Sequence, residues 1–235
     1  MLGDEQIARY SRQIILPQVG GKGQQRLLSA AVALVGRGEM ATTAALYLAA
    51  AGVGALTLAG AADGAAADLE TLNADCHVLV SAWPDEAAGA DDLARGHEVV
   101  IAADVQPDMA LHLNAACVAR RKRLLWGRAE GGTGWMAVLA GAPEAACFGC
   151  LERRWQPPPL PQQWRGASPV VRGGVAAFIG TLQATAVIQQ MLDIESTTTA
   201  RFLTYDALEV AVTDTRLDKD PHCLICRTGV GELRP

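Results

Sequence analysis

The 235-residue sequence has no excess of positive charge and no extended basic cluster. Its 20 Lys and Arg residues face 25 Asp and Glu residues, which gives a formal net charge of −5. The basic run Arg120-Arg121-Lys122-Arg123 is typical of a solvated turn. Because phosphate backbones are bound by clustered Lys and Arg side chains, nucleic acid is not expected as a partner.

The sequence also lacks the features of export and of membrane insertion. Its start, Met1-Leu2-Gly3-Asp4-Glu5, has no basic segment followed by an apolar core, and no long uninterrupted apolar run occurs after it. The six cysteines suit a reducing compartment, in which Cys76 and Cys117 are expected to be small buried residues. A cytoplasmic protein without a membrane partner is predicted.

Four cysteines form two C-x-x-C pairs, Cys147/Cys150 and Cys223/Cys226. Four thiolates in such pairs are what a tetrahedral zinc ion needs, and turn-forming and charged residues flank both pairs. We therefore predict one zinc site, which attaches the C-terminal part to the middle of the chain. With four cysteines and no open ligand position, the site would be structural. Two redox dithiols, or four free thiols in a core, are the alternatives.

A βαβ unit begins at the apolar run from Ala30 to Val35. This run ends in Gly36-Arg37-Gly38, and a helical stretch over 41–51 leads to a second apolar run at 55–58. Continuous apolar strands are typical of parallel sheets covered on both faces, and the crossover between them is right-handed. The pattern predicts an α/β fold with a doubly wound, Rossmann-like, mostly parallel sheet.

Other segments complete this prediction. Further strands are expected at 76–80, 98–102 and 123–126, an antiparallel extension at 135–139, helices at 108–119 and 174–192, and a hairpin at 201–217. Residues 60–68 are expected to be a low-complexity connector, and the Pro-rich stretch 155–166 an extended crossing. We expect a single domain over 1–235, with a helical arm (1–30), a Rossmann-like core (31–140), and a zinc-stapled C-terminal part (141–235) that includes a crossover segment (155–173).

Several motifs along nearly the whole chain match one family in its order. They are Arg9-Tyr-Ser-Arg-Gln-Ile-Ile-Leu-Pro17, Ala45-Leu-Tyr-Leu-Ala-Ala-Ala-Gly-Val-Gly54, Leu125-Trp-Gly127, the first cysteine pair, Ile179-Gly-Thr-Leu-Gln-Ala184, Tyr205-Asp-Ala207 and the last cysteine pair. The chain resembles the ThiF/MoeB/HesA family, the bacterial relatives of ubiquitin-activating enzymes. The resemblance implies dimers with a four-cysteine zinc site. It also implies that ATP-Mg binds at the glycine-rich turn and that the C-terminal glycine of a ubiquitin-like sulfur carrier is adenylated.

The chain departs from the family pattern at this turn. The family has G-x-G-G-x-G, whereas this sequence reads Gly36-Arg-Gly-Glu-Met-Ala41, with Gly36 and Gly38 as the remnant of the nucleotide turn. Glu39 would bring a carboxylate toward the phosphates, a repulsion of several kcal/mol in a partly dry cleft, and Met40 and Ala41 would add bulk. We expect ATP-Mg binding to be impaired. Alternatively, Gly36 and Gly38 serve only a tight turn.

Three further positions depart in the same direction. Relatives carry an acidic residue for the ribose where this chain has Gly60, and the segment that grips the phosphates is replaced by the short connector. The magnesium-binding Asp of relatives corresponds to Val105, with Asp104 one residue early and expected to point elsewhere. Residues 165–169, where some relatives hold a transfer cysteine, contain none, so no thioester is expected there.

One family residue is retained. In dimers of the family, the second Arg of the R-Y-x-R-Q string reaches the neighbouring subunit's nucleotide site, and Arg12 matches it. We therefore expect a pseudoenzyme subunit that pairs with an active homologue, donates Arg12 in trans and supports activation of a ubiquitin-like sulfur carrier. Alternatively, Arg9, Tyr10 and Arg12 only pack and cap the first helix.

Two other functions stay open at this point. One is a residually active adenylyltransferase that uses Asp104 with the Gly36/Gly38 turn, and ATP–pyrophosphate exchange by the chain alone would favour it. The other is a non-catalytic homodimeric binding module that recognises a carrier's tail in a groove near Trp126, Trp135 and the Pro-rich crossover.

Overall fold

A computed structural model of the chain describes residues 2–62, 64–84, 87–142, 144–155, 169–194 and 200–227. The helices are α1 (Asp4–Ile14), α2 (Gly20–Ser29), α3 (Glu39–Ala51), α4 (Ala65–Leu72), α5 (Ala87–Gly96), α6 (Pro107–Ala119), α7 (Phe148–Arg154) and α8 (Pro169–Met191). The strands are β1 (Ala31–Gly36), β2 (Ala55–Ala59), β3 (His77–Ser81), β4 (Val99–Ala103), β5 (Arg123–Glu130), β6 (Thr133–Leu139), β7 (Arg201–Asp206) and β8 (Ala211–Arg216).

The strands form one eight-stranded sheet in the order β3-β2-β1-β4-β5-β6-β7-β8. The pairs from β3 to β5 are parallel, and the pairs from β5 to β8 are antiparallel. In this register Val32 lies beside Leu56 on one side and Val99 on the other. The predicted mostly parallel, Rossmann-like sheet with an antiparallel extension is confirmed.

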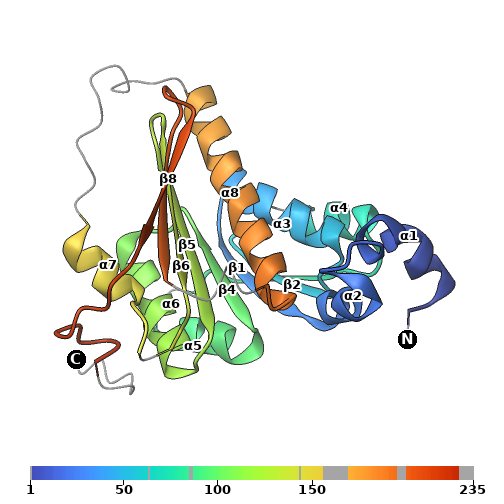
Figure 1. Ribbon diagram of the computed structural model, residues 1–235, viewed down its shortest axis with the longest axis horizontal. Coiled ribbons are helices and arrows are strands. Elements are labelled where there is room, and N and C mark those ends of the chain that lie inside the picture. Colours follow the sequence, from blue (N-terminus) through green and yellow to red (C-terminus); the bar gives the residue numbers. More distant parts are fainter. Residues whose placement is uncertain are drawn as a thin grey trace.

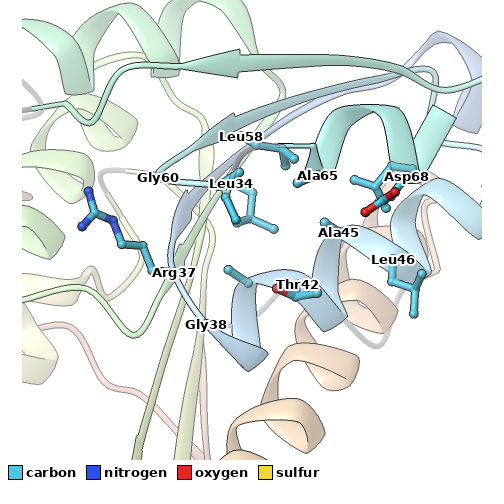
Figure 2. A pocket seen from close by; sticks show the side chains of 14 residues that line it. Leu34, Arg37, Gly38, Thr42, Ala45, Leu46, Leu58, Gly60, Ala65 and Asp68 are labelled. Carbon is cyan, nitrogen blue, oxygen red and sulfur yellow. The ribbon is translucent and has the colours of Figure 1, made fainter.

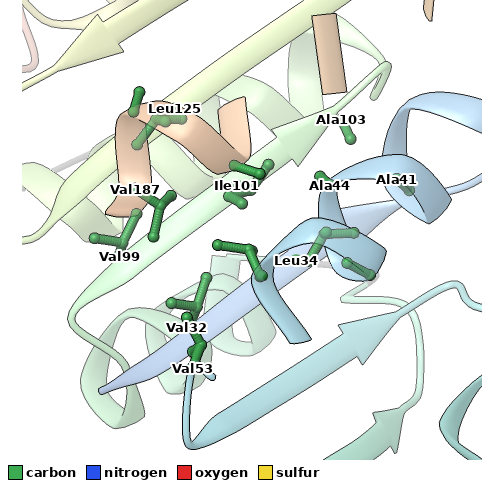
Figure 3. Packing of buried hydrophobic residues seen from close by; sticks show 14 of the residues in the cluster. Val32, Leu34, Ala41, Ala44, Val53, Val99, Ile101, Ala103, Leu125 and Val187 are labelled. Carbon is green, nitrogen blue, oxygen red and sulfur yellow. The ribbon is translucent and has the colours of Figure 1, made fainter. Parts of the chain in front are cut away.

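Helices cover both faces of the parallel part of the sheet, with α5, α6 and α7 on one face and α3, α4 and α8 on the other (Figure 1). Alternate residues of β1 serve the two faces, because side chains of a strand point in opposite directions in turn. Val32 and Leu34 belong to the core on the α3 and α8 side, whereas Ala33 and Val35 belong to the core on the α5 and α6 side. Figure 3 shows the first of these cores, where β1, β4 and β5 meet α3 and α8.

The tightest helix crossing joins α3 to α8. A Cβ atom at Gly180 of α8 would clash with the backbone carbonyl of Met40 in α3, so glycine lets the two backbones touch. By length and composition alone, the 22 residues Val170–Met191 could cross a membrane, although Arg172 and several polar residues interrupt this apolar stretch. Because α8 packs on α3, β5 and β6, its apolar composition also suits a core helix.

Several elements differ from the prediction: helices α5 and α7 were not expected, and other boundaries shift, above all at α4 and α8. The expected connector at 60–68 gives way to α4 at Ala65, because alanine-rich turns are strong helix formers once Gly64 starts the helix. Helix α8 begins at Pro169 rather than at Gly174, since proline is tolerated in a first turn, so the last part of the expected crossover segment is helical. The Pro-rich residues 156–168 lie outside the described residues.

Trp126 and Trp135 line no surface groove in the described part of the chain, because both tryptophans are buried. The Trp155 ring lies 5.5 Å from the Trp126 ring and 5.3 Å from the Trp135 ring, centroid to centroid. Edge-on aromatic packing of this kind belongs to a core. The binding-module hypothesis therefore loses the two tryptophans that were assigned to its surface.

Candidate functional site

Strands β1 and β4 are neighbours at the point where the strand order changes direction: β2 and β3 lie on one side of β1, and β4 and β5 lie on the other. Open α/β sheets bind ligands at the carboxyl ends of the strands at such a point. Gly36 pairs with Ala103 at this edge. A Cβ atom at Gly36 would clash with the Ala103 carbonyl oxygen, and Gly38 has a φ of 76° as it precedes α3. Both glycines are thus required by the turn itself, and the structure brings this turn next to Asp104.

A cavity of about 660 Å³ lies beside the turn, between β1, β2, α3 and α4 (Figure 2). Most of its walls are leucine, alanine and glycine; the 14 lining residues are Leu34, Arg37, Gly38, Ala41, Thr42, Ala45, Leu46, Leu58, Gly60, Ala61, Ala62, Ala65, Asp68 and Leu69. Two of them are charged, and they lie at opposite ends: Arg37 points away from the other side chains, and Asp68 stands beside Leu46 and Ala45. The cavity is apolar with a carboxylate at its far end.

Trp83 covers the end of β2. A Cβ atom at Gly60 would lie 2.7 Å from two Trp83 ring carbons, so the indole rests directly on this glycine, whose φ is 93°. The Arg37 guanidinium carbon lies 5.1 Å from the centroid of the Trp83 ring, a cation–π distance. Arg37 is therefore engaged with Trp83, and no acidic side chain stands at Gly60. Trp83 was not predicted as a site residue, because nothing in the local sequence signals its contacts with Gly60 and Arg37.

Glu39 and Met40 lie differently from what the sequence suggested. Glu39 is exposed in the first turn of α3, where a carboxylate stabilises the helix dipole, and it does not line the cavity. Its carboxyl carbon lies 3.8 Å from the position of a Cβ atom at Gly173, so it faces the start of α8. Met40 is 1% exposed and packs in the core instead of narrowing the turn, whereas Ala41 does line the cavity.

Asp104 follows β4 directly and has a φ of 56°. The expected strand alternation therefore does not determine its direction, because the backbone has already left the extended region. Its carboxylate pairs with the Arg172 guanidinium of α8 and accepts a long hydrogen bond from the Ala129 N–H at 3.5 Å. Val105 is buried. Arg172 carries no sequence signal for this role, since it lies 68 residues away.

The N-terminal motif separates into two parts. Tyr10 is buried, and its hydroxyl lies 3.3 Å from Asn73 Oδ1 and 3.0 Å from Asp75 Oδ2, which also pairs with Arg9. Burial is the main reason why the pKa of Tyr10 is raised to about 12. Arg12 is exposed in the last turn of α1, and within the described part of the chain it makes no ion pair. Packing thus accounts for Arg9 and Tyr10 but not for Arg12.

The arm also fixes where Arg12 is. The Tyr10 ring packs on Gly52, which ends α3, whereas Gly38 precedes its first residue. A helix of 13 residues is about 20 Å long. Arg12 therefore lies near the opposite end of α3 from the glycine turn of its own chain, and the structure does not bring the two together.

The four cysteines of the C-x-x-C pairs come together as predicted. Their sulfur atoms all lie within 4.8 Å of one another, and all four residues are buried. The Sγ atoms of Cys147 and Cys223 are 3.7 Å apart, and those of Cys150 and Cys226 are 3.4 Å apart. Tetrahedral zinc with bonds of about 2.3 Å holds its sulfur atoms about 3.8 Å apart. The cluster can therefore hold one metal ion.

The surroundings of the cluster suit this role. The Asp220 N–H donates to Cys150 Sγ at 3.4 Å, and the Phe148 N–H donates to Asn114 Oδ1 at 2.8 Å, which ties α7 to α6. Hydrogen bonding between the two sulfurs lowers the pKa of Cys150 and raises the pKa of Cys147, so one sulfur of this pair favours the thiolate form that binds a metal. One cluster of four sulfurs favours a metal site over two separate redox dithiols. Cys76 and Cys117 are buried elsewhere, as predicted.

Comparisons with known proteins agree with this architecture. The chain is 33% identical over 251 residues to the Bos taurus "Adenylyltransferase and sulfurtransferase MOCS3", and the match covers 96% of this chain and 54% of the relative. The Drosophila grimshawi protein of the same name is 30% identical over 251 residues, with 96% and 55% covered. The chain thus spans about half the length of these relatives.

Solved structures show the same fold at low identity. A crystal structure of E. coli MccB with ATP superimposes with a TM-score of 0.73 at 16% identity, over 96% of this chain and 76% of that chain. A structure of PaaA gives a TM-score of 0.72 at 14% identity, over 93% and 85%. The model of the ThiF family matches residues 10–61 and 60–225. From its motifs, its sheet and this match, the chain belongs to the ThiF family.

Proposed function

We propose that the chain has lost its own adenylation centre and acts as a subunit that supports activation of a ubiquitin-like sulfur carrier by an active ThiF-family partner. The observation that carries this proposal is the lining of the cavity beside the glycine turn, where Asp68 faces an apolar chamber. A triphosphate needs cations along its length, and a carboxylate in that chamber repels it.

The residues present do not fit ATP-Mg. Arg37 is stacked on Trp83, and Arg172 is paired with Asp104, so neither guanidinium is free to receive a phosphate. Gly60, covered by Trp83, offers no carboxylate to a ribose. Exposed Glu39 adds negative charge near the entrance although it stands outside the cavity. These contacts support the loss of nucleotide binding.

The cysteine cluster fits a structural zinc ion. Its four sulfurs complete a tetrahedral shell, so no position is left for substrate. In a reducing compartment such as the cytoplasm, the thiolates stay available for the metal. Cys147, Cys150, Cys223 and Cys226 would hold the ion and join α7 to the segment after β8.

A second subunit is supported by the exposed side chains at the α1 end of the molecule. Ile15 is 76% exposed, and Leu16 and Tyr47 are both 49% exposed. Apolar side chains that gather on one surface favour a protein interface, and Ile15 and Leu16 directly follow α1. Because Arg12 lies far from its own glycine turn, a nucleotide contact from it would be made in the site of another subunit, either a copy of this chain or an active homologue.

The first test is titration of the purified, zinc-loaded chain with ATP-Mg. We expect no saturable heat up to about 1 mM nucleotide, which places the binding free energy above roughly −4 kcal/mol. An active ThiF-family enzyme serves as the positive control. Micromolar binding, together with ATP–pyrophosphate exchange by the chain alone, would replace this proposal by the residually active adenylyltransferase.

The second test concerns Arg12. In a mixture of this chain, an active ThiF-family enzyme from the same organism and its carrier, we expect Arg12→Ala to slow carrier adenylation at least tenfold. A hydrogen bond to a charged phosphate contributes about 1.5–3 kcal/mol, which is why the loss is large. Lys22→Ala, which removes a positive charge from α2, is the matched control. Equal rates for the two variants would exclude a role of Arg12 in trans.

A further inference from the structure

A salt bridge lies at the edge of the sheet where β1 and β4 end. Asp104 follows β4 at this edge, held by a hydrogen bond of 2.9 Å from its N–H to the Gly127 carbonyl of β5. Its left-handed backbone turns the carboxylate toward α8, where Arg172 of the first turn meets it. The side chain of Asp104 is 21% exposed and that of Arg172 is 43% exposed, so the pair is partly shielded from water.

Two elements bring negative charge to this edge of the sheet. Glu39 from the start of α3 faces Gly173, the residue that follows Arg172. Two carboxylates thus lie near one turn of α8. Carboxylate oxygens are ligands that divalent cations prefer. Arg172 is the cationic partner of Asp104 within the described ranges, and its guanidinium supplies positive charge at this carboxylate.

We propose that Arg172 takes the place of a divalent cation at Asp104, so that the chain itself neutralises this edge of the sheet and no metal ion binds there. The inference rests on the proposed loss of the adenylation centre and extends it, because it names the residue that makes the metal unnecessary. Arg172 is a positioning residue here: it fixes the start of α8 against the end of β4. A metal would have to displace it from the carboxylate.

The test compares four zinc-loaded proteins, the natural chain, Asp104→Asn, Arg172→Gln and Arg172→Gln/Asp104→Asn, by thermal unfolding with and without millimolar MnCl₂. We expect the natural chain to be unaffected by manganese. Arg172→Gln should melt about 2–4 °C lower, and manganese should restore most of that loss by binding the freed carboxylate. The double variant should show no response to manganese, because the ligand is gone.

Arg128→Gln is the matched control, since Arg128 pairs with Glu130 at 3.3 Å on neighbouring β5 and has a similarly exposed side chain. It should not create a response to manganese. The inference is overturned if manganese shifts the natural chain and Asp104→Asn abolishes that shift, or if Arg172→Gln gains no response. Both outcomes concern the metal alone, so they are independent of the ATP titration that tests the proposed function.

Discussion

Replacing Cys150 by alanine is expected to release the zinc ion and to lower the melting temperature by about 10 °C or more. Three buried sulfurs cannot complete a tetrahedral shell, and the segment after β8 then loses its attachment to α7. A structural metal contributes several kcal/mol to folding, and about 1 kcal/mol corresponds to roughly 2–4 °C for a chain of this size. Differential scanning calorimetry and metal analysis by mass spectrometry measure both effects.

Cys117→Ala is the matched control for this prediction. Cys117 and Cys150 are each 1% exposed, so each substitution removes one sulfur atom from an equally buried position. Burial raises the pKa of Cys117 to about 12, and this thiol lies outside the four-sulfur cluster. The control should keep one zinc per chain and lose only the packing of its sulfur. If Cys150→Ala also kept its zinc, the four-cysteine site would be wrong.

Gly180→Ala is expected to destabilise the chain by about 1–3 kcal/mol, or roughly 2–12 °C in melting temperature. A single methyl group at this position would clash with the Met40 carbonyl and force α8 away from α3. Because α8 also carries Arg172 and lies on β5 and β6, the movement of α8 should also disturb the Arg172–Asp104 pair. Denaturant unfolding measures the free energy, and near-UV circular dichroism reports the packing.

The same helix offers a matched control in Gly174→Ala. No atom lies within 4 Å of a Cβ at Gly174, so alanine there meets open space. Its lower backbone entropy in the unfolded chain should stabilise the protein by about 0.5–1 kcal/mol. Opposite signs for the two variants would confirm that close helix contact, rather than helix propensity, requires glycine at position 180. Equal effects would refute it.

Much of the fold was predictable because its signals are local. Each signal lies within one short segment of the sequence: the apolar run at β1, the glycines before α3 and the apolar run at β2. The antiparallel hairpin of β7 and β8 was predicted in the same way. The start of α8 was not, because a first helical turn accepts Pro169 only when the residues after it continue the helix.

The candidate site was predictable in part. Counting cysteines and their spacing identified the four sulfurs of the metal cluster, since only a few residues separate the members of each pair. The spacing could not show that Glu39 turns toward α8 or that Met40 enters the core, because both depend on how α8 lies across α3. The family motif therefore predicted the right positions along the chain but the wrong locations for the side chains of Glu39 and Met40.

Periodicity and side-chain chemistry along the chain revealed the apolar strands, the helices before β2 and β5, the family, and the cysteines that can hold a metal, but not helices α4, α5 and α7. Long-range packing alone determined that Trp83 rests on Gly60, that Asp104 meets Arg172, and that Arg12 stands at the far end of α3 from the glycine turn. These contacts join residues that are distant in sequence, and their geometry is set by packing of the whole sheet and its helices.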